Sequence, residues 1–218
     1  MILYGSTLSP FVRKVAAYCH ERGIAFEHSV SPPGQPAPDF LAASPMRKIP
    51  AIRDGDYTLA DSSAILHYLE AKYPDGGLLP VEPELRGRAV FFDEWADTLM
   101  VGCLGKIFFN RLVGPLFLGM PGDEAMAAKA ACDELPPLLD YLDSVAPDEG
   151  GFLVGDRLTI ADLAIASPFA NLAHLDIPID AERNPRLRAY AERILARDSF
   201  RPLIEREQAV IARARAAA

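Results

Sequence analysis

The sequence predicts a small α/β domain followed by a larger domain built only of helices. Short apolar runs with strand character alternate with helical patterns up to about residue 75, whereas every later periodic segment has helical spacing. Between the two parts, residues 76–83 contain two glycines and two prolines and show no periodicity, as is typical of a linker. The predicted domains are therefore residues 1–75 and 84–218, joined by residues 76–83.

The first strand and the first helix are predicted by a short segment at the start of the chain. Ile2-Leu3-Tyr4 is an apolar run that ends at Gly5, as a buried strand would. Ser9 and Pro10 then occupy positions preferred at a helix start, because serine caps a helix and proline lacks only an N–H that would be unbonded there. Apolar residues recur every three to four positions until Gly23, which ends the predicted helix.

Turn signals define the rest of the first domain. Asp54-Gly55 is a strong hairpin dipeptide, and it predicts two antiparallel strands on either side of the turn. Asp61 and Ser62 open a further helix, which Tyr73-Pro74 ends. The remaining predicted elements are a strand over residues 25–29, a proline-rich loop over 31–38, a brief helix over 39–43, and the hairpin strands 49–52 and 57–60.

Five helices are predicted for the second domain. Their ranges are 84–109, 123–145, 160–172, 185–196 and 200–213. Pro136-Pro137 predicts a break inside the second of them, because proline removes a helical hydrogen bond and clashes with the preceding turn. No segment of alternating strand character competes with this prediction.

The charge distribution argues against a polyanionic partner. The formal net charge is −8, and DNA or RNA binding depends on a basic surface. Residues 1–75 are nearly neutral, with 7 basic and 8 acidic side chains, whereas the rest of the chain holds 15 and 22. Because Arg13-Lys14 and Arg47-Lys48 group the cations of the first domain, a small anionic ligand could bind there without opposing a strong field.

Neither a metal site nor a membrane span is expected. The three cysteines and four histidines are scattered, with no CxxC or Cys/His cluster. An odd number of thiols, without a signal-like N-terminal segment, favours a cytoplasmic protein whose cysteines are small buried side chains. The most apolar stretch, residues 99–120, includes Lys106, Arg111 and Pro115, which argue against a transmembrane helix.

Four motifs stand at mutually consistent spacings. Ser9-Pro10-Phe11-Val12-Arg13-Lys14-Val15 begins the first helix, Lys48-Ile49-Pro50 precedes the hairpin, and Asp61-Ser62 begins the helix after it. In the second domain, Thr159 and Asp162 occupy the two positions of a capping box, flanked by an apolar staple. Each pattern alone is most simply a structural one: a helix cap, a strand that begins with proline, or a helix start.

Together these motifs and the order of the elements resemble the glutathione transferase superfamily over essentially the whole chain. The resemblance implies a thioredoxin-like domain followed by an all-helical one. The first motif is similar to serine-type members, especially the tau class and related bacterial enzymes. One departure is that the loop over residues 31–38 has no basic residue where the tau class places a lysine.

The resemblance implies a role for each motif residue. Ser9 would donate its hydroxyl to the glutathione sulfur while the helix dipole favours the thiolate. A cis Ile49–Pro50 bond would leave the Ile49 backbone free to pair with the cysteinyl unit. The implied contacts to the two ends of glutathione are Lys48 with the glycyl carboxylate, Ser62 with the γ-glutamyl carboxylate and Asp61 with its ammonium group. The capping box would be structural.

An electrophile pocket is expected between the two domains. Helical spacing and the family resemblance suggest that residues of the first helices of the second domain line it, opposite Leu8 and Phe11; the candidates there are Met100, Cys103, Lys106, Ile107, Phe108 and Arg111. A stripe of this kind is more often core than pocket. The mixture of phenylalanine with Lys106 and Arg111 suggests an apolar substrate with a polar or anionic group.

The expected activity is conjugation of glutathione to small electrophiles, as in detoxification, or reduction of peroxides, with glutathione as co-substrate and a homodimer as the assembly. One alternative is a glutathione-dependent isomerase of the maleylacetoacetate type, although Ser6-Thr7-Leu8-Ser9 does not match the Ser-Ser-Cys pattern of those members. Another is a binding or stress protein that uses the fold as a scaffold without turnover.

Overall fold

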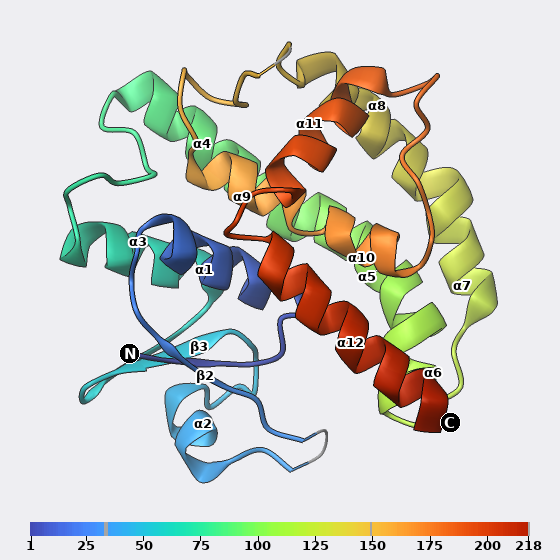
Figure 1. The fold of residues 1–218 in the computed structure, drawn as a ribbon, viewed down its shortest axis with the longest axis horizontal. Coiled ribbons are helices and arrows are strands. Elements are labelled where there is room, and N and C mark those ends of the chain that lie inside the picture. The colour runs from blue at the N-terminus through green and yellow to red at the C-terminus, as the bar shows by residue number, and fades with distance from the viewer. Residues whose placement is uncertain (33–34, 149, 218) are drawn as a thin grey trace.

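The computed structural model describes residues 1–32, 35–148 and 150–217, so Pro33 and Gly34 of the predicted 31–38 loop lie outside it. A small sheet with three helices forms the N-terminal domain, and the remaining helices form the second domain beside it (Figure 1). This is the architecture expected from the sequence, a mixed α/β domain followed by a helical one.

The sheet has four strands in the order β2-β1-β3-β4. They are β1 (Ile2–Tyr4), β2 (Glu27–Ser29), β3 (Ala51–Asp54) and β4 (Tyr57–Ala60). β2 is parallel to β1, whereas β3 is antiparallel to both β1 and β4. The second strand is shorter than predicted, since pairing with β1 begins only at Glu27.

The N-terminal helices cover both faces of this sheet. They are α1 (Pro10–Glu21), α2 (Pro38–Ala43) and α3 (Ser62–Lys72). Leu3 and Ile52 pack into the core that includes α1 and α3, whereas Tyr4 and Ala51 face α2. Because strand side chains alternate between faces, two neighbouring residues serve two different layers. Figure 1 shows α1 and α3 on one side of the sheet and α2 on the other.

The first helix of the second domain is longer than predicted. It runs continuously over Pro83–Phe117. Its segments are α4 (Pro83–Trp95), the π-helical turn η1 (Ala96–Met100), α5 (Val101–Phe108), the π-helical turn η2 (Phe109–Val113) and α6 (Gly114–Phe117). Pro115 does not end it, because the π-helical turn before α6 changes the hydrogen-bonding pattern.

This 35-residue helix is long and apolar enough to cross a membrane by length and composition alone. One of its faces, however, belongs to the core of the helical domain. Phe92, Met100, Leu104 and Ile107 along it are buried against the other helices.

The remaining helices agree with the predicted positions but differ at two prolines. They are α7 (Glu124–Lys129), η3 (Ala130–Glu134), α8 (Leu135–Val145), α9 (Ile160–Ala166), α10 (Phe169–His174), α11 (Pro185–Leu195) and α12 (Arg201–Ala217). The break predicted at Pro136-Pro137 is wrong, because a π-helical turn precedes the prolines and they occupy the first turn of α8. The predicted 160–172 helix is instead interrupted at Ser167 and Pro168.

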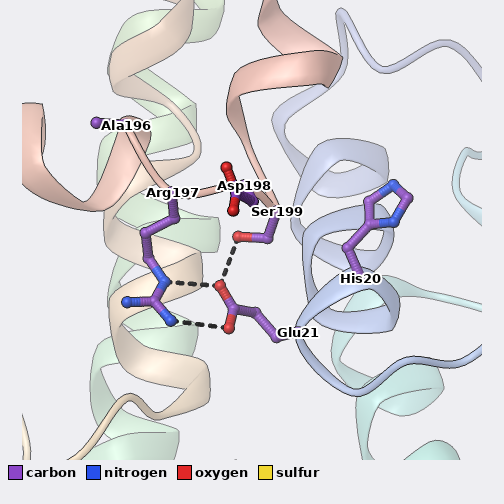
Figure 2. A pocket seen from close by; sticks show the side chains of 6 residues that line it. All are labelled: His20, Glu21, Ala196, Arg197, Asp198 and Ser199. Carbon is purple, nitrogen blue, oxygen red and sulfur yellow. Dashed lines mark hydrogen bonds and ion pairs between the residues drawn. The ribbon is translucent and has the colours of Figure 1, made fainter.

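Polar contacts join the two domains at both ends of α1. At its C-terminal end, Glu21 accepts two hydrogen bonds from the Arg197 guanidinium and one from the Ser199 hydroxyl, at 2.6–2.9 Å. Figure 2 shows this contact at the edge of a groove of about 550 Å³ that His20 also lines. From there α12 extends along the domain interface toward α6 (Figure 1).

Candidate active site

The sheet register brings three of the sequence motifs to one edge. Tyr4 of β1 pairs with Ala51 of β3, and Ala51 pairs with Ala60 of β4. The loop to α1 leaves this row after Tyr4, Pro50 immediately precedes Ala51, and Asp61 immediately follows Ala60. Antiparallel pairing therefore gathers three segments of which the first and the last are more than 50 residues apart in the sequence.

Ser9 stands at the N-cap of α1 with its hydroxyl uncommitted. Its backbone is extended, with φ −76° and ψ 124°, and its side chain makes no capping hydrogen bond to the helix. The first turn of α1 contains no acidic residue. A helix N-terminus carries partial positive charge, so an anion beside Ser9 would meet no opposing carboxylate from this turn.

The Lys48-Ile49-Pro50 motif packs closely against the segment that leads to Ser9, and the contact is at Gly5. The Ile49–Pro50 bond is cis, as the family resemblance implied. Gly5 has φ +117°, and a Cβ on it would lie 2.7 Å from Cβ of Ile49 and 2.9 Å from Cγ2 of Val12. Only glycine combines this backbone conformation with such close packing. Sequence reasoning used Gly5 as a strand end and missed this contact.

The third motif has both a capping and an anion-site geometry. Asp61 caps α3 by accepting a hydrogen bond from the Ala64 N–H at 3.0 Å, and its φ is +82°. Such a conformation is strained for a residue other than glycine. Ser62 is buried, and its hydroxyl donates to Asp97 at 3.1 Å. Its backbone N–H lies in the first turn of α3, where an anion would be favoured.

A buried charged cluster supports this helix start. The Lys14 ammonium lies 2.7 Å from both Asp93 and Asp97, and the Ser63 hydroxyl donates to the same two carboxylates. Burial raises the pKa of Asp97, against the lowering effect of the Lys14 charge. The cluster links α1, α3 and the first helix of the second domain.

Two side chains of the helical domain hold the Ser9 loop on either side. The Ser167 hydroxyl donates to the Pro10 carbonyl at 2.7 Å, and the Asn171 amide donates to the Leu8 carbonyl at 3.0 Å. Both residues are buried. These contacts fix the backbone of the residues that flank Ser9, and sequence reasoning did not identify them.

Arg13 ties the same residues to α12. Its guanidinium donates to the Ser167 carbonyl, to the Asn171 amide oxygen and to the Glu207 carboxylate, at 2.6–3.2 Å. Burial opposes ionisation of Glu207, but the Arg13 charge and a hydrogen bond from His174 prevail and lower its pKa. Arg13 and Lys14 therefore do not themselves face an anionic ligand in the first domain, because both cations are buried and paired with acidic side chains.

A cavity of about 570 Å³ opens beside Ser9 between the domains. Its lining is almost entirely apolar, with Leu8 and Ile49 on one side and residues of α5, η2 and α12 on the other. The full lining is Ser6, Leu8, Ser9, Pro10, Val30, Ser31, Pro32, Ile49, Gly105, Phe108, Phe109, Val113, Phe117, Leu118 and Val210. No described residue of this lining is charged.

Of the predicted electrophile-pocket residues, Leu8 and Phe108 line this cavity, and Phe11 and Met100 do not. Cys103 and Ile107 lie in the helical core, with the Cys103 thiol directed to the Ala130 carbonyl. Arg111 pairs with Glu124, and Lys106 pairs with Glu134 at the surface. The family resemblance gave the general position of the pocket, but the individual residues were chosen by helical spacing, which does not distinguish a core face from a pocket face.

The remaining sequence-based expectations concern Lys48 and the cysteines. Lys48 is exposed, and its backbone N–H and carbonyl both form hydrogen bonds with the Ser44 hydroxyl. Burial raises the pKa of Cys19 to about 12 and that of Cys103 to about 11, whereas Cys132 is exposed and thus not the buried residue expected. Within the described residues, no group of three or more histidine, cysteine or acidic side chains could hold a metal ion.

Comparisons with known proteins decide the family. The description "Glutathione S-transferase, N-terminal domain" matches residues 3–80, and "Glutathione S-transferase, C-terminal domain" matches residues 115–205. The chain is 33% identical to glutathione S-transferase 3 of Zea mays over 208 residues, which cover 93% of this chain and 92% of the maize protein. The chain belongs to the glutathione S-transferase family.

Other relatives support the same family assignment. Glutathione S-transferase theta-3 of Mus musculus is 32% identical over 204 residues, which cover 89% of this chain and 81% of the mouse protein. A glutathione S-transferase structure from Methylobacterium radiotolerans, in complex with glutathione sulfonate, is 26% identical and superimposes with a TM-score of 0.75 over 93% of each chain. The chain therefore shares both sequence and fold with this family; the finer serine-type, tau-like assignment stays a prediction.

Proposed function

We propose that this transferase conjugates the thiolate of glutathione to small, largely apolar electrophiles, with Ser9 as the catalytic hydroxyl. The observation that carries the proposal is the position of Ser9: its hydroxyl caps no backbone group, it stands at a helix N-terminus without acidic neighbours in the first turn, and it opens onto an apolar cavity. A hydroxyl donor and a helix dipole both stabilise a thiolate more than a thiol.

Residues 1–75 would form the glutathione-binding unit. We place the γ-glutamyl carboxylate at the Ser62 N–H and hydroxyl, with Asp61 near the ammonium group. The cysteinyl backbone would pair with Ile49 beside Pro50, and Lys48 would reach the glycyl carboxylate. Supporting this placement, the three segments lie along one sheet edge and Ser62 stands in the first turn of α3. The relative from Methylobacterium radiotolerans was solved with glutathione sulfonate, a ligand of the same class.

The cavity favours an electrophile with a substantial apolar body. Six phenylalanine, leucine or valine side chains of residues 84–218 line it: Phe108, Phe109, Val113, Phe117, Leu118 and Val210. Burial of apolar surface there would be favourable in proportion to area. The same activated thiolate could attack a peroxide or add reversibly to an isomerisable double bond. A substrate panel containing a chloronitroaromatic, an organic hydroperoxide and a maleylacetoacetate-type cis-dienone distinguishes these three reactions.

We also propose a cytoplasmic homodimer. Phe91 and Leu99 expose 43% and 48% of their surface on one helix, and Tyr57 exposes 46% on the edge strand β4. Exposed apolar side chains indicate a subunit contact where they form a contiguous patch, and we propose that these three contribute to one. The free thiols and the buried face of the Pro83–Phe117 helix are consistent with a reducing, aqueous compartment.

The test of the proposed function is the Ser9→Ala variant. Turnover of a chloronitroaromatic should fall by about ten- to a thousand-fold, in line with loss of one donor to a developing or bound anion. Affinity for an S-alkylated glutathione should stay nearly constant, because that ligand has no thiolate. Ultraviolet titration of the bound thiol should give a higher pKa in Ser9→Ala than in the wild type. Each pKa unit of that difference corresponds to about 1.4 kcal/mol of lost preferential binding to the thiolate.

Ser144→Ala is a matched control, because Ser144 is an exposed helical serine whose hydroxyl bonds only to its own helix. If Ser9→Ala titrates and turns over like the control, Ser9 is a structural residue and the activating group must be sought at Ser6 or Thr7. Retention on immobilised glutathione without turnover of any panel substrate by the wild type would instead favour a non-catalytic binding protein.

A further inference from the structure

A second groove, of about 420 Å³, adjoins the apolar cavity on the α12 side. The two share four lining residues: Ser6, Leu8, Val30 and Val210. The rest of the groove is Thr7, His28, Leu203, Arg206, Glu207, Ala209 and Arg213. Unlike the cavity, this groove is lined by charged side chains. We call it the arginine groove.

Arg206 and Arg213 lie seven residues apart on α12 and therefore project from the same face of the helix. Both are exposed. Among the described residues, neither has a carboxylate within ion-pair distance, whereas Arg13, Arg111 and Arg197 are all paired. The Nε of Arg213 donates to the Ala209 carbonyl at 3.2 Å, which leaves the two terminal nitrogens of that guanidinium for another partner.

Glu207 is the acidic residue of the groove, and its charge is already compensated. Its side chain is 1% exposed and receives hydrogen bonds from Arg13 and His174. The buried pair with Arg13 is electrically neutral, so the two free arginines determine the sign of the field in the groove. On a chain with a formal charge of −8, a positive surface next to the active site is a local exception.

We propose that the arginine groove binds an anionic group, a carboxylate or sulfonate, on the electrophile whose apolar body fills the cavity beside Ser9. The preferred substrates of this transferase would then be amphipathic acids rather than neutral apolar compounds. A planar guanidinium matches a carboxylate or sulfonate and can bind it through two parallel hydrogen bonds. The inference rests on the proposed conjugation activity and adds the chemical class of its second substrate.

This placement differs from the one suggested by the sequence. Arg111 and Lys106 were the cations expected near the substrate, but both are paired with glutamates outside the cavity. Arg206 and Arg213 come from the last helix, which the pocket prediction did not include. Ser6, Leu8, Val30 and Val210 line both spaces, which therefore meet at these residues. A substrate that occupies both must therefore carry its charge at a distance from its reactive carbon.

The experiment compares matched pairs of chloronitrobenzenes. In each pair one compound carries a carboxylate and the other the corresponding primary amide, attached directly to the ring or through a chain of two or four carbons. The quantity measured is kcat/KM with saturating glutathione, and the ratio of carboxylate to amide removes differences in ring reactivity. The variants are R206Q, R213Q and the double variant.

We expect the wild type to prefer the carboxylates, most strongly at one chain length. The double variant should lower the carboxylate-to-amide ratio by about five- to tenfold, as for loss of charge-assisted contacts at a partly exposed site. The control is R215Q, which removes the same charge from the same helix outside the groove. It should leave the ratio nearly unchanged. A double variant whose ratio equals that of R215Q would overturn the proposal.

Two further measurements distinguish failure of the anion-site proposal from failure of the proposed conjugation activity. If the KM for glutathione rises in the double variant while the ratio stays constant, the arginines serve a carboxylate of glutathione and the proposal is wrong. Calorimetric titration with 2-naphthoate and 2-naphthamide measures binding without turnover. A wild type that turns over none of the chloronitrobenzenes refutes the conjugation activity. In that case, tighter binding of 2-naphthoate than of 2-naphthamide that is lost in R206Q/R213Q would still support the anion site. Equal binding of 2-naphthoate and 2-naphthamide by the wild type would refute the anion site.

Discussion

Replacement of Asp162 by alanine should destabilise the helical domain severely without touching the chemistry. Asp162 lies at the third position of α9 and is completely buried. Its carboxylate accepts hydrogen bonds from the Thr159 N–H and hydroxyl, the Leu153 N–H and the Tyr190 hydroxyl, at 2.8–3.2 Å. The residue therefore joins the start of α9 to the preceding loop and to α11.

The expected loss follows from these four donors. A helix cap alone is worth about 0.5–2 kcal/mol, which is the loss that the capping-box motif predicts from the sequence. In the structure, however, Thr159 and Tyr190 are themselves buried, with 1% and 2% of their surface exposed. Each buried donor left without a partner costs about 1–3 kcal/mol. Allowing for partial relaxation and for water entering the space, we expect Asp162→Ala to lower the free energy of unfolding by about 3–5 kcal/mol.

Urea denaturation followed by circular dichroism measures this loss, with kcat at low temperature as a test of the remaining folded protein. Asp156→Ala is the matched control, because Asp156 is an exposed aspartate in the same segment. The control should change the free energy of unfolding by less than about 0.5 kcal/mol. If the two variants unfold at the same urea concentration, the buried carboxylate does not stabilise the fold as argued. If the Asp162 variant is stable but inactive, the residue acts in the site instead.

Two other predictions concern the domain interface. Asn171→Ala removes the donor to the Leu8 carbonyl, which precedes Ser9. The variant should lower kcat several-fold and raise the pKa of the glutathione thiol in the complex. An unchanged titration of the bound thiol would make Asn171 purely structural. The folded-state pKa of Glu207 is lowered, so its ionised form stabilises the fold above its unfolded pKa, and that contribution is lost as pH falls through the folded value. In urea unfolding between about pH 7 and about pH 3, the advantage of wild type over Glu207→Gln should therefore shrink on acidification; a constant difference would contradict this.

Local signals made much of the fold predictable from the sequence. Ser9-Pro10 marks the start of α1, Asp54-Gly55 the turn between β3 and β4, and Thr159 the start of α9; each depends on residues within a few positions of one another. The helix end predicted at residue 109 and the break predicted at Pro136-Pro137 were wrong for a physical reason. A π-helical turn before each proline lets the chain continue, and no residue pattern at the prolines themselves indicates such a turn.

The environment of the charged residues could not be predicted in this way. Arg13 and Glu207 are 194 positions apart, yet their side chains form a buried ion pair. In the sequence, Arg13 lies between Val12 and Lys14 on a predicted helix and could equally face solvent or a ligand. Which of these holds depends on whether a carboxylate from another element is buried opposite, because an unpaired buried charge would be too costly. Arg111 was assigned to the pocket for the same reason, because its partner Glu124 could not be identified from the sequence. Arg206 was not assigned, because its position beside the Ser9 loop depends on the packing of α12.

The polar contacts across the interface imply that the chemistry depends on the docking of the two domains. The N-terminal domain contains Ser9, but the hydrogen bonds to the carbonyls on either side of it come from Ser167 and Asn171 of the helical domain. Arg13 connects both of these residues to Glu207 on α12, the helix that also borders the apolar cavity and the arginine groove. A small shift of α12 would therefore alter the position of the Ser9 hydroxyl and the shape of the apolar cavity together. Because catalysis needs geometry accurate to a fraction of an ångström, loosening this interface should reduce turnover before it unfolds either domain.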